Sequence, residues 1–309
     1  MIINNSSVYV LLSSYNGMEY IEEQIDSIIC QSGDGIHLII RDDGSSDGTR
    51  EVLDRLSARE TGRLTLLPEA RLGVIGSFFH LLFQTPDDAA FVAFADQDDV
   101  WLPGKVARAR LALEEQVPQG RPALYCSRLK YVDADLAPLG LSPLPRRPLC
   151  LANALVENVA AGCTIMLNRA AVDLLRSVPP PAAVQMHDWW FYIVVSAFGT
   201  VIFDPEPSLL YRQHGNNVVG AGRNPLARLA RKVRGQLTRP PGLCRRQAVA
   251  LRQAYGDAMG PAARDILGRF LDASEGRGTP SYVLGQDRVF RQAPLDDLAL
   301  RGLMLLGRI

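Results

Sequence analysis

A regular alternation of short apolar runs with amphipathic segments restricts the fold of this chain more than any other feature of its sequence. Residues 8–12 form a compact apolar run, residues 19–29 place isoleucines at helical spacing, and residues 37–40 form the next apolar run. This order predicts strand, helix, strand. Where such units repeat, the strands pair in parallel and the helices cover the sheet, so the sequence predicts an α/β fold with a mainly parallel sheet.

The same alternation continues to about residue 120 and then becomes mixed. We expect further helices over residues 50–59, 77–83 and 103–115, and further strands over residues 64–67, 89–95 and 123–127. After these the sequence predicts a proline-rich loop at 141–148, a strand over 162–167, a helix over 169–176 and a strand over 201–203. Strand signals end near residue 222, so we expect the remaining chain to be helical.

Charge divides the sequence into two parts, which we assign as a catalytic domain over residues 1–222 and a basic helical extension over 223–309. The first part holds 17 Lys/Arg against 26 Asp/Glu, and the second holds 16 against 7. Residues 223–252 contain nine basic residues, no acidic residue and a helical stripe of apolar side chains. Such a segment could contact an anionic membrane surface or pack on the catalytic domain. It lacks aromatic residues, so we expect no nucleic-acid partner.

Other bulk features favour a cytoplasmic protein that could associate with the inner face of the cytoplasmic membrane. The five cysteines are odd in number and lie far apart, without the spacing of zinc ligands or redox pairs. No basic region followed by an apolar stretch occurs near residue 1, as a secretion signal would require. The charge-free apolar run at residues 189–203 is too short to cross a bilayer.

Two acidic clusters follow predicted strands directly. Asp42 and Asp43 end one strand, and Asp96, Asp98 and Asp99 follow another. The carboxyl ends of parallel strands share one edge of a sheet, which is where ligands of such folds bind. Carboxylates gathered there repel one another unless a cation lies between them. Mg²⁺ or Mn²⁺ held by one or two carboxylates and by phosphate oxygens is the simplest solution, so the sequence predicts a metal site for a diphosphate-bearing substrate.

The motifs around these clusters make a family resemblance specific. They are Ser-Ser-Tyr-Asn-Gly at 13–17, Arg-Asp-Asp-Gly-Ser-Ser-Asp-Gly-Thr at 41–49, Ala-Asp-Gln-Asp-Asp-Val-Trp at 95–101, His-Asp-Trp-Trp at 187–190 and Tyr-Arg-Gln-His-Gly-Asn-Asn at 211–217. In this order they resemble the family 2 inverting glycosyltransferases of the GT-A fold. The resemblance implies a Rossmann-like nucleotide-binding sheet, here followed by a C-terminal helical extension.

The resemblance also implies a site for a nucleotide-sugar donor. Tyr15 would pack against the base, while Asp42 or Asp43 would accept a hydrogen bond from a base N–H. Arg212 could neutralise phosphate charge, and Arg128 could face donor, acceptor or solvent. The residues assigned to the donor are Ser14, Tyr15, Asn16, Asp42, Asp43, Asp96, Gln97, Arg128 and Arg212.

For the divalent metal, the resemblance implies Asp98 as the main ligand. Asp96 would act directly or through ribose or water, and His214 would approach from the C-terminal side, although His214 could also be an ordinary loop residue. Asp188 would be the general base that deprotonates the acceptor hydroxyl, which gives a product of inverted configuration. The alternative for Asp188 is a helix N-cap.

Three neighbours of Asp188 are candidates for the acceptor side. His187 stands where many relatives carry an acidic residue, so it could tune Asp188 or contact the acceptor. Trp189 and Trp190 could stack on a sugar, but we expect at least one of them to be packed in the core.

The full set of motifs is similar to that of bacterial rhamnosyltransferases of cell-surface polysaccharide synthesis. This implies dTDP-L-rhamnose as donor and a lipopolysaccharide or other surface glycan as acceptor. A UDP- or GDP-sugar donor is the alternative on the same fold. A nucleotidyltransferase would need a glycine-rich basic loop, which residues 13–17 are not. A non-catalytic carbohydrate- or nucleic-acid-binding module is the remaining alternative.

Overall fold

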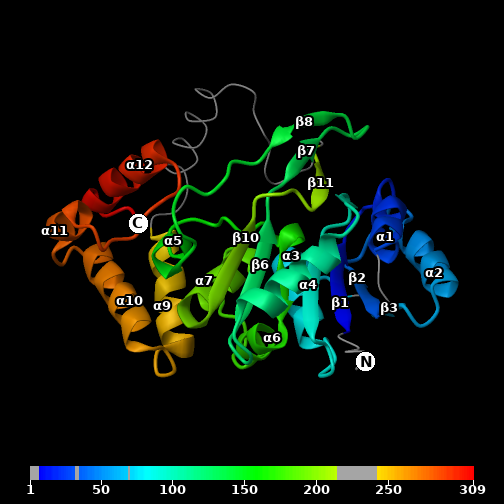
Figure 1. The fold of residues 1–309 in the computed structure, drawn as a ribbon, viewed down its shortest axis with the longest axis horizontal. Helices are drawn as coiled ribbons and strands as arrows, with labels where there is room; N and C mark the ends of the chain where they lie inside the picture. The colour runs from blue at the N-terminus through cyan, green and yellow to red at the C-terminus, as the bar shows by residue number, and fades with distance from the viewer. Residues whose placement is uncertain (1–6, 32–34, 69, 214–241) are drawn as a thin grey trace.

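The computed structural model describes residues 7–31, 35–68, 70–213 and 242–309, and its centre is a seven-stranded sheet (Figure 1). The strand order is β10-β6-β9-β4-β1-β2-β3. These strands are β1 (Val8–Ser14), β2 (Ile36–Asp42), β3 (Leu64–Leu67), β4 (Phe91–Ala95), β6 (Ala123–Ser127), β9 (Met166–Asn168) and β10 (Thr200–Asp204). A smaller sheet has the order β5-β11-β7-β8, with β5 (Val100–Trp101), β7 (Lys130–Val132), β8 (Pro138–Leu141) and β11 (Leu209–Arg212).

Six of the seven strands in the large sheet point the same way. β1 pairs in parallel with β2 and β4, β2 with β3, and β10 with β6, whereas β9 is antiparallel to β4 and β6. The carboxyl ends of β1, β2, β4, β6 and β10 therefore face one edge. The expected mainly parallel α/β sheet is confirmed, and the edge where the acidic clusters lie is common to all these strands.

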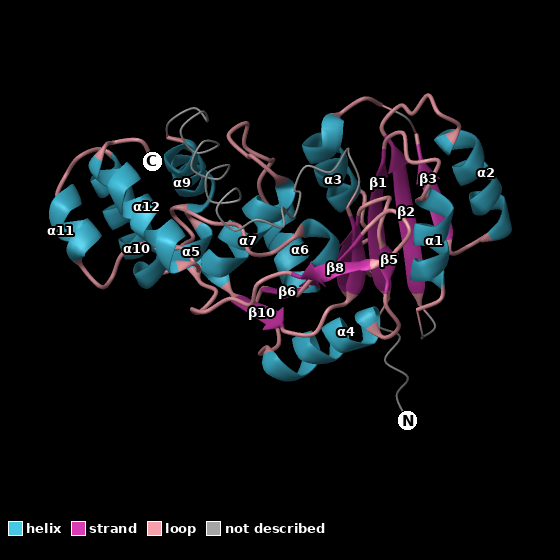
Figure 2. Cartoon of the chain, turned by 90° about the horizontal axis from the view of Figure 1, so that it is seen from above, coloured by secondary structure: helices cyan, strands magenta, loops and turns pink. Residues whose placement is uncertain are grey.

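Helices cover both faces of the sheet, as Figure 2 shows. Successive side chains of a strand point to opposite faces, so Val10 and Leu12 of β1 join one apolar cluster and Leu11 joins the other. The first cluster includes residues of α1 (Ile21–Ile29), α2 (Thr49–Arg59) and α4 (Lys105–Gln116). The second includes residues of α3 (Gly73–Phe83), α5 (Leu151–Ala154), α6 (Arg169–Arg176) and α7 (His187–Phe198).

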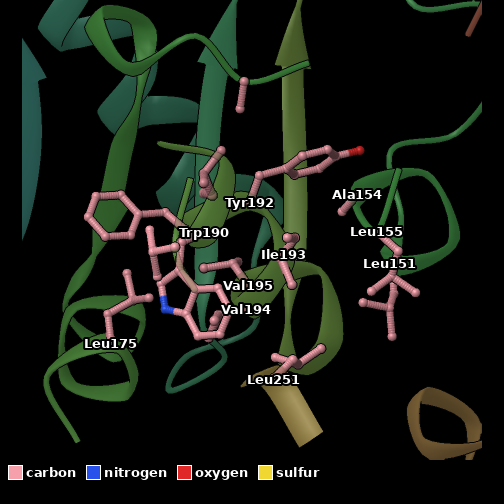
Figure 3. Close-up of a cluster of buried hydrophobic side chains, with 14 of the residues drawn as sticks. Leu151, Ala154, Leu155, Leu175, Trp190, Tyr192, Ile193, Val194, Val195 and Leu251 are labelled. Atoms are coloured by element: carbon pink, nitrogen blue, oxygen red, sulfur yellow. The ribbon is translucent and has the colours of Figure 1, made fainter. Parts of the chain in front are cut away.

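The described C-terminal helices pack in succession, with the first against α7 and the second against α5. They are α9 (Leu243–Tyr255), α10 (Pro261–Ser274), α11 (Thr279–Leu284) and α12 (Pro294–Leu305). Leu251 of α9 lies beside the buried residues of α7 in Figure 3, and the same apolar cluster extends into α10. The expected boundary between residues 222 and 223 lies outside the described residues, as does the basic stripe before residue 242.

Most predicted elements are found within a few residues of their expected bounds, but two differ. The helix expected over 77–83 begins at Gly73, because the side chain of Asp43 accepts hydrogen bonds from the N–H groups of Leu72 and Gly73. The strand expected over 162–167 is wrong in its first half, where Gly162–Thr164 forms a 3₁₀ turn. Among the described residues, no helix combines the length and hydropathy needed to span a membrane.

Candidate donor and transfer site

The loop after β1 is held to the end of β4 by Gln97. The side-chain oxygen of Gln97 accepts from the backbone N–H of Tyr15 at 2.7 Å and from the Ser14 hydroxyl at 3.1 Å, while its amide donates to the Tyr15 carbonyl. Tyr15 itself is 44% exposed, and Arg71 lies over its ring at 5.2 Å from the centroid. The structure thus brings together Ser14, Tyr15 and Gln97, three of the predicted donor residues, and leaves the ring of Tyr15 partly exposed.

Asn16 belongs to the same loop and connects it to the residues after β2. Its backbone has φ of 49°, and its side-chain oxygen accepts from the N–H of Ser46 at 2.9 Å. Asp42 accepts from both the N–H and the hydroxyl of Ser45. Because Ser45 also accepts from the Asn16 N–H, the loops that follow β1 and β2 form one hydrogen-bonded unit.

Asp43 is fully engaged by protein groups. Its carboxylate pairs with Arg41 at 2.7 Å and accepts from the N–H groups of Leu72 and Gly73 at the start of α3. Burial alone would raise the pKa of Asp43, but the hydrogen bonds from Leu72, Arg41 and Gly73 outweigh it and hold this pKa below its usual value. Asp43 is therefore ionised and fixed in place at the predicted base-binding position.

The carboxylates after β4 lie in the opposite kind of environment. Burial and the charges of Asp98 and Asp188 raise the pKa of Asp96 to about 7. Burial and the charges of Asp96 and Asp98 raise the pKa of Asp99 well above its usual value. One oxygen of Asp99 is buried without a hydrogen-bond partner in the part of the chain that the structure describes. Lys105 acts on Asp96 from nearby, but its charge does not offset the burial and the repulsion within this group of carboxylates.

Ligand atoms of Asp96, Asp99 and Cys163 lie within 4.8 Å of one another. Two carboxylates with an unsatisfied oxygen fit a divalent cation, since oxygen atoms are the ligands that Mg²⁺ and Mn²⁺ prefer. Asp98, the predicted main ligand, is outside this cluster of described residues, although its charge acts on both neighbouring carboxylates. His214 lies outside the described residues.

Asp188 lies in the first turn of α7 and is only 8% exposed. Its carboxylate accepts from the N–H of Trp189 at 2.6 Å and from the N–H of Gly162 at 3.1 Å. Burial outweighs these bonds and raises its pKa to about 6. The N-cap of α7 is Met186, so the structure contradicts the alternative that Asp188 is that cap. A carboxylate with a pKa close to the working pH is suited to accept a proton.

His187 is packed among aromatic rings. It stacks on Phe78 with 4.0 Å between ring centroids, and Phe94 and Phe191 are its further neighbours. Neither ring nitrogen has a hydrogen-bond partner among the described residues, and burial lowers the pKa of His187 to about 3. His187 is thus neutral and makes no hydrogen bond to Asp188.

The two tryptophans after Asp188 differ in environment. Trp190 is 1% exposed and belongs to the core, as expected for one of the pair. Trp189 is half-buried, and its ring N–H donates to the carbonyl of Ala154 at 2.7 Å. Only Trp189 retains surface that an acceptor could reach.

The two predicted arginines make contacts within the protein. Arg212 is 3% exposed, donates to the carbonyl of Asp98 and pairs with Glu23 at 2.5 Å. Arg212 therefore holds the loop after β4 in place from within the protein. Arg128 donates to the carbonyl of Ser142 at 2.6 Å, which ties the end of β6 to the loop after β8.

Three buried polar residues near the site were not predicted from the sequence. Arg41 is 0% exposed, and its guanidinium also donates to Ser77. Lys105 donates to the carbonyl of Cys163 at 2.8 Å, and burial lowers its pKa to about 8 although nearby acidic groups oppose the shift. Arg41 stands next to the acidic motif, which was a usable signal. Lys105 and Cys163 are brought to the site only by the tertiary fold.

Comparison with known proteins agrees with this geometry. Residues 9–138 match the family model described as Glycosyl transferase family 2. The dTDP-rhamnosyl transferase RfbG of Shigella flexneri is 26% identical over 231 residues, which cover 68% of this chain and 74% of RfbG. The S. aureus TarS 1-349 structure in complex with UDP-GlcNAc superposes with a TM-score of 0.58 at 15% identity, over 98% of this chain and 82% of TarS 1-349.

A second solved structure shows the same fold. The mannosyltransferase PcManGT from Pyrobaculum calidifontis, in complex with GDP-Man and Mn²⁺, has a TM-score of 0.50 at 16% identity and is matched over 97% of this chain and 85% of its own. The chain has the GT-A fold, and its residues 9–138 match the model of glycosyltransferase family 2.

Proposed function

We propose that this protein is an inverting, metal-assisted glycosyltransferase that moves L-rhamnose from dTDP-L-rhamnose to a hydroxyl of a lipopolysaccharide or other cell-surface glycan. The observation that carries the proposal is the pair of environments at one sheet edge. The buried carboxylate of Asp188 has a pKa raised to about 6, and the carboxylates after β4 repel one another, with one oxygen of Asp99 left without a hydrogen-bond partner among the described residues. The first suits a general base, and the second suits the metal that a diphosphate leaving group requires.

Each residue then has a defined part in the transfer. Asp188 accepts the proton of the acceptor hydroxyl while that oxygen attacks the anomeric carbon from the side opposite the diphosphate. Asp98, with Asp96 and His214, would hold Mg²⁺ or Mn²⁺, which would stabilise the negative charge of the leaving diphosphate. Tyr15 offers its exposed ring to the base, and Gln97 keeps the Tyr15 backbone in place for this contact.

The choice of dTDP-L-rhamnose is supported by the likeness to RfbG and by the motifs at 95–101, 187–190 and 211–217. TarS and PcManGT are described with UDP-GlcNAc and GDP-Man, which makes other nucleotide sugars the alternative donors on this fold. We further propose that the enzyme acts at the cytoplasmic face of the membrane, where residues 223–252 would contact anionic lipid headgroups.

A donor screen tests the proposal. Binding and hydrolysis of dTDP-L-rhamnose, UDP-glucose, UDP-galactose and GDP-mannose are measured with Mg²⁺ and with Mn²⁺ for the unchanged protein, Asp98→Ala and the exposed control Asp87→Ala. We expect dTDP-L-rhamnose to bind best, and Asp98→Ala to lose metal-dependent binding by at least about 100-fold while Asp87→Ala does not. A better uridine or guanosine donor would overturn the choice of sugar nucleotide, and no binding of any donor would overturn the enzyme assignment.

A further inference from the structure

A groove lies at the free edge of the large sheet, away from the donor residues. It separates the proline-rich loop after β8 from β10, the outermost strand of the sheet on that side. Because β10 runs parallel to β6, its carboxyl end faces the same edge as the acidic motif after β4. We call this feature the loop groove. It has a volume of about 580 Å³, which is within the range of small-molecule sites.

One side of the loop groove is apolar. Leu144 and Leu149 line it from the loop, and Val201 and Phe203 line it from β10. Leu144 is 45% exposed, and the two strand residues are partly exposed. Leu139 and Leu141, which precede the loop on β8, are exposed as well. An exposed apolar wall of this kind favours a ligand that carries a hydrocarbon segment.

The other side of the loop groove carries excess positive charge. Arg147 stacks on Phe290 at 3.5 Å and lies 3.9 Å from Asp297. Asp297 also pairs with Arg288 at 2.8 Å and Arg301 at 3.2 Å, so one carboxylate serves three guanidinium groups. The guanidinium of Arg146 is exposed and has no ion-pair or hydrogen-bond partner among the described residues. The cluster can therefore accept an anion.

The loop that carries these arginines is anchored to the C-terminal helices. The side-chain oxygen of Gln292 accepts from the N–H groups of both Arg146 and Arg147, and its amide donates to the carbonyl of Arg147. Pro145 and Pro148 restrict the backbone on either side. The groove is thus formed before any ligand binds, which lowers the entropy cost of binding.

We infer that the loop groove binds a phosphate ester with an attached hydrocarbon chain, as the lipid-linked part of the acceptor. The guanidinium group of Arg146 suits a phosphate because it can make two parallel hydrogen bonds to the phosphate oxygens, Arg147 adds positive charge to the same groove, and the apolar wall suits the chain. The inference rests on the proposed function in one respect, namely that the acceptor is a glycolipid. The inference assigns a binding role to Arg146 and defines a chemical class of acceptor, neither of which follows from the donor residues.

The test measures binding of geranyl phosphate, with inorganic phosphate and geraniol as the two halves of that probe, by calorimetry on the full chain. We expect geranyl phosphate to bind at least tenfold more tightly than either half. Arg146→Glu and Val201→Asp should each weaken it at least tenfold. Arg110→Glu, which changes an exposed arginine of α4 on another part of the surface, should leave it unchanged.

Three results would overturn the inference. Equal affinity of Arg146→Glu and Arg110→Glu for geranyl phosphate would show that the groove is not the site. If the unchanged protein bound inorganic phosphate as tightly as geranyl phosphate, the apolar wall would play no part in binding. A dimer of the unchanged protein that Val201→Asp dissociates would show that a second copy occupies the groove. Donor binding is measured in parallel and should be the same in all variants, so a wrong donor assignment would be seen separately from a wrong groove.

Discussion

The carboxylates that follow β2 and those that follow β4 lie at the same sheet edge and look alike in sequence, but their surroundings are opposite. Asp43 has an ion pair with Arg41 and two backbone donors, and its pKa is lowered. Asp96 and Asp99 lie close together and within the field of Asp98, and their pKa values are raised. The first arrangement stabilises the fold, whereas the repulsion in the second opposes it.

This difference separates carboxylates whose hydrogen bonds and ion pairs stabilise the protein from carboxylates that oppose its stability. Groups that raise one another's pKa without a compensating partner lower stability, so their presence needs a functional reason. Asp188 belongs with the second group because burial dominates its environment. The comparison can be tested by neutralising one carboxylate at a time and measuring activity and stability separately.

Asp188→Asn should give the largest effect. We expect kcat to fall by about 10³-fold, because the acceptor hydroxyl loses its proton acceptor. Donor affinity should stay within about twofold, and the melting temperature should not fall, since an ionised buried carboxyl is removed. Steady-state kinetics, donor titration and thermal unfolding check these outcomes. The control is Asp173→Asn, an exposed carboxylate of α6. A loss of stability that accompanies the loss of activity would make Asp188 a structural residue.

Asp43→Asn should show the reverse pattern. It leaves the guanidinium of Arg41 buried without its counter-charge, which costs about 3 to 5 kcal/mol. We expect the melting temperature to fall by roughly 10 °C, measured by calorimetry. Asp54→Asn, whose exposed carboxylate pairs with Arg50, is the matched control and should change it by less than about 2 °C. An unchanged melting temperature in Asp43→Asn would remove the distinction between the two groups of carboxylates.

The pH dependence of transfer gives the smallest but most direct effect. Because burial raises the pKa of Asp188 to about 6, its carboxylate is ionised above that pH and protonated below it. Only the ionised form accepts a proton, so kcat should fall about tenfold for each pH unit below 6. The residual activity of Asp188→Asn should not show this fall of kcat at acidic pH, while Asp43→Asn should still show it. If kcat of the unchanged protein began to fall only near pH 4, the raised pKa of Asp188 would be contradicted.

The sequence predicted the strands and the acidic motifs well because both depend on local patterns. A buried strand such as β1 is an apolar run, and the carboxylates that follow it are its neighbours in the chain. The start of α3 was missed because its first N–H groups are capped by Asp43, which is 30 residues from Gly73 in sequence. Local helix propensity contains no information about such a contact.

The environment of each site residue could not be predicted for the same reason. Lys105 and Cys163 reach the acidic group after β4 only once α4 and the 3₁₀ turn have packed on the sheet. Arg212 was expected to face phosphate, but in the described structure it binds Asp98 and Glu23 within the protein. Residue type thus indicated the chemistry, whereas packing determined the protonation and the partners of each group.

The position of α7 has a consequence for how the protein becomes active during its synthesis. This helix carries Asp188 in its first turn, and its last residue, Phe198, packs on Tyr255 of α9 with 5.6 Å between ring centroids. The helices that cover α7 follow it in the chain and leave the ribosome after it. A nascent chain that already contains every residue of the proposed donor site therefore still lacks the partner surface of α7, and premature termination before α9 would yield a chain with an exposed apolar face.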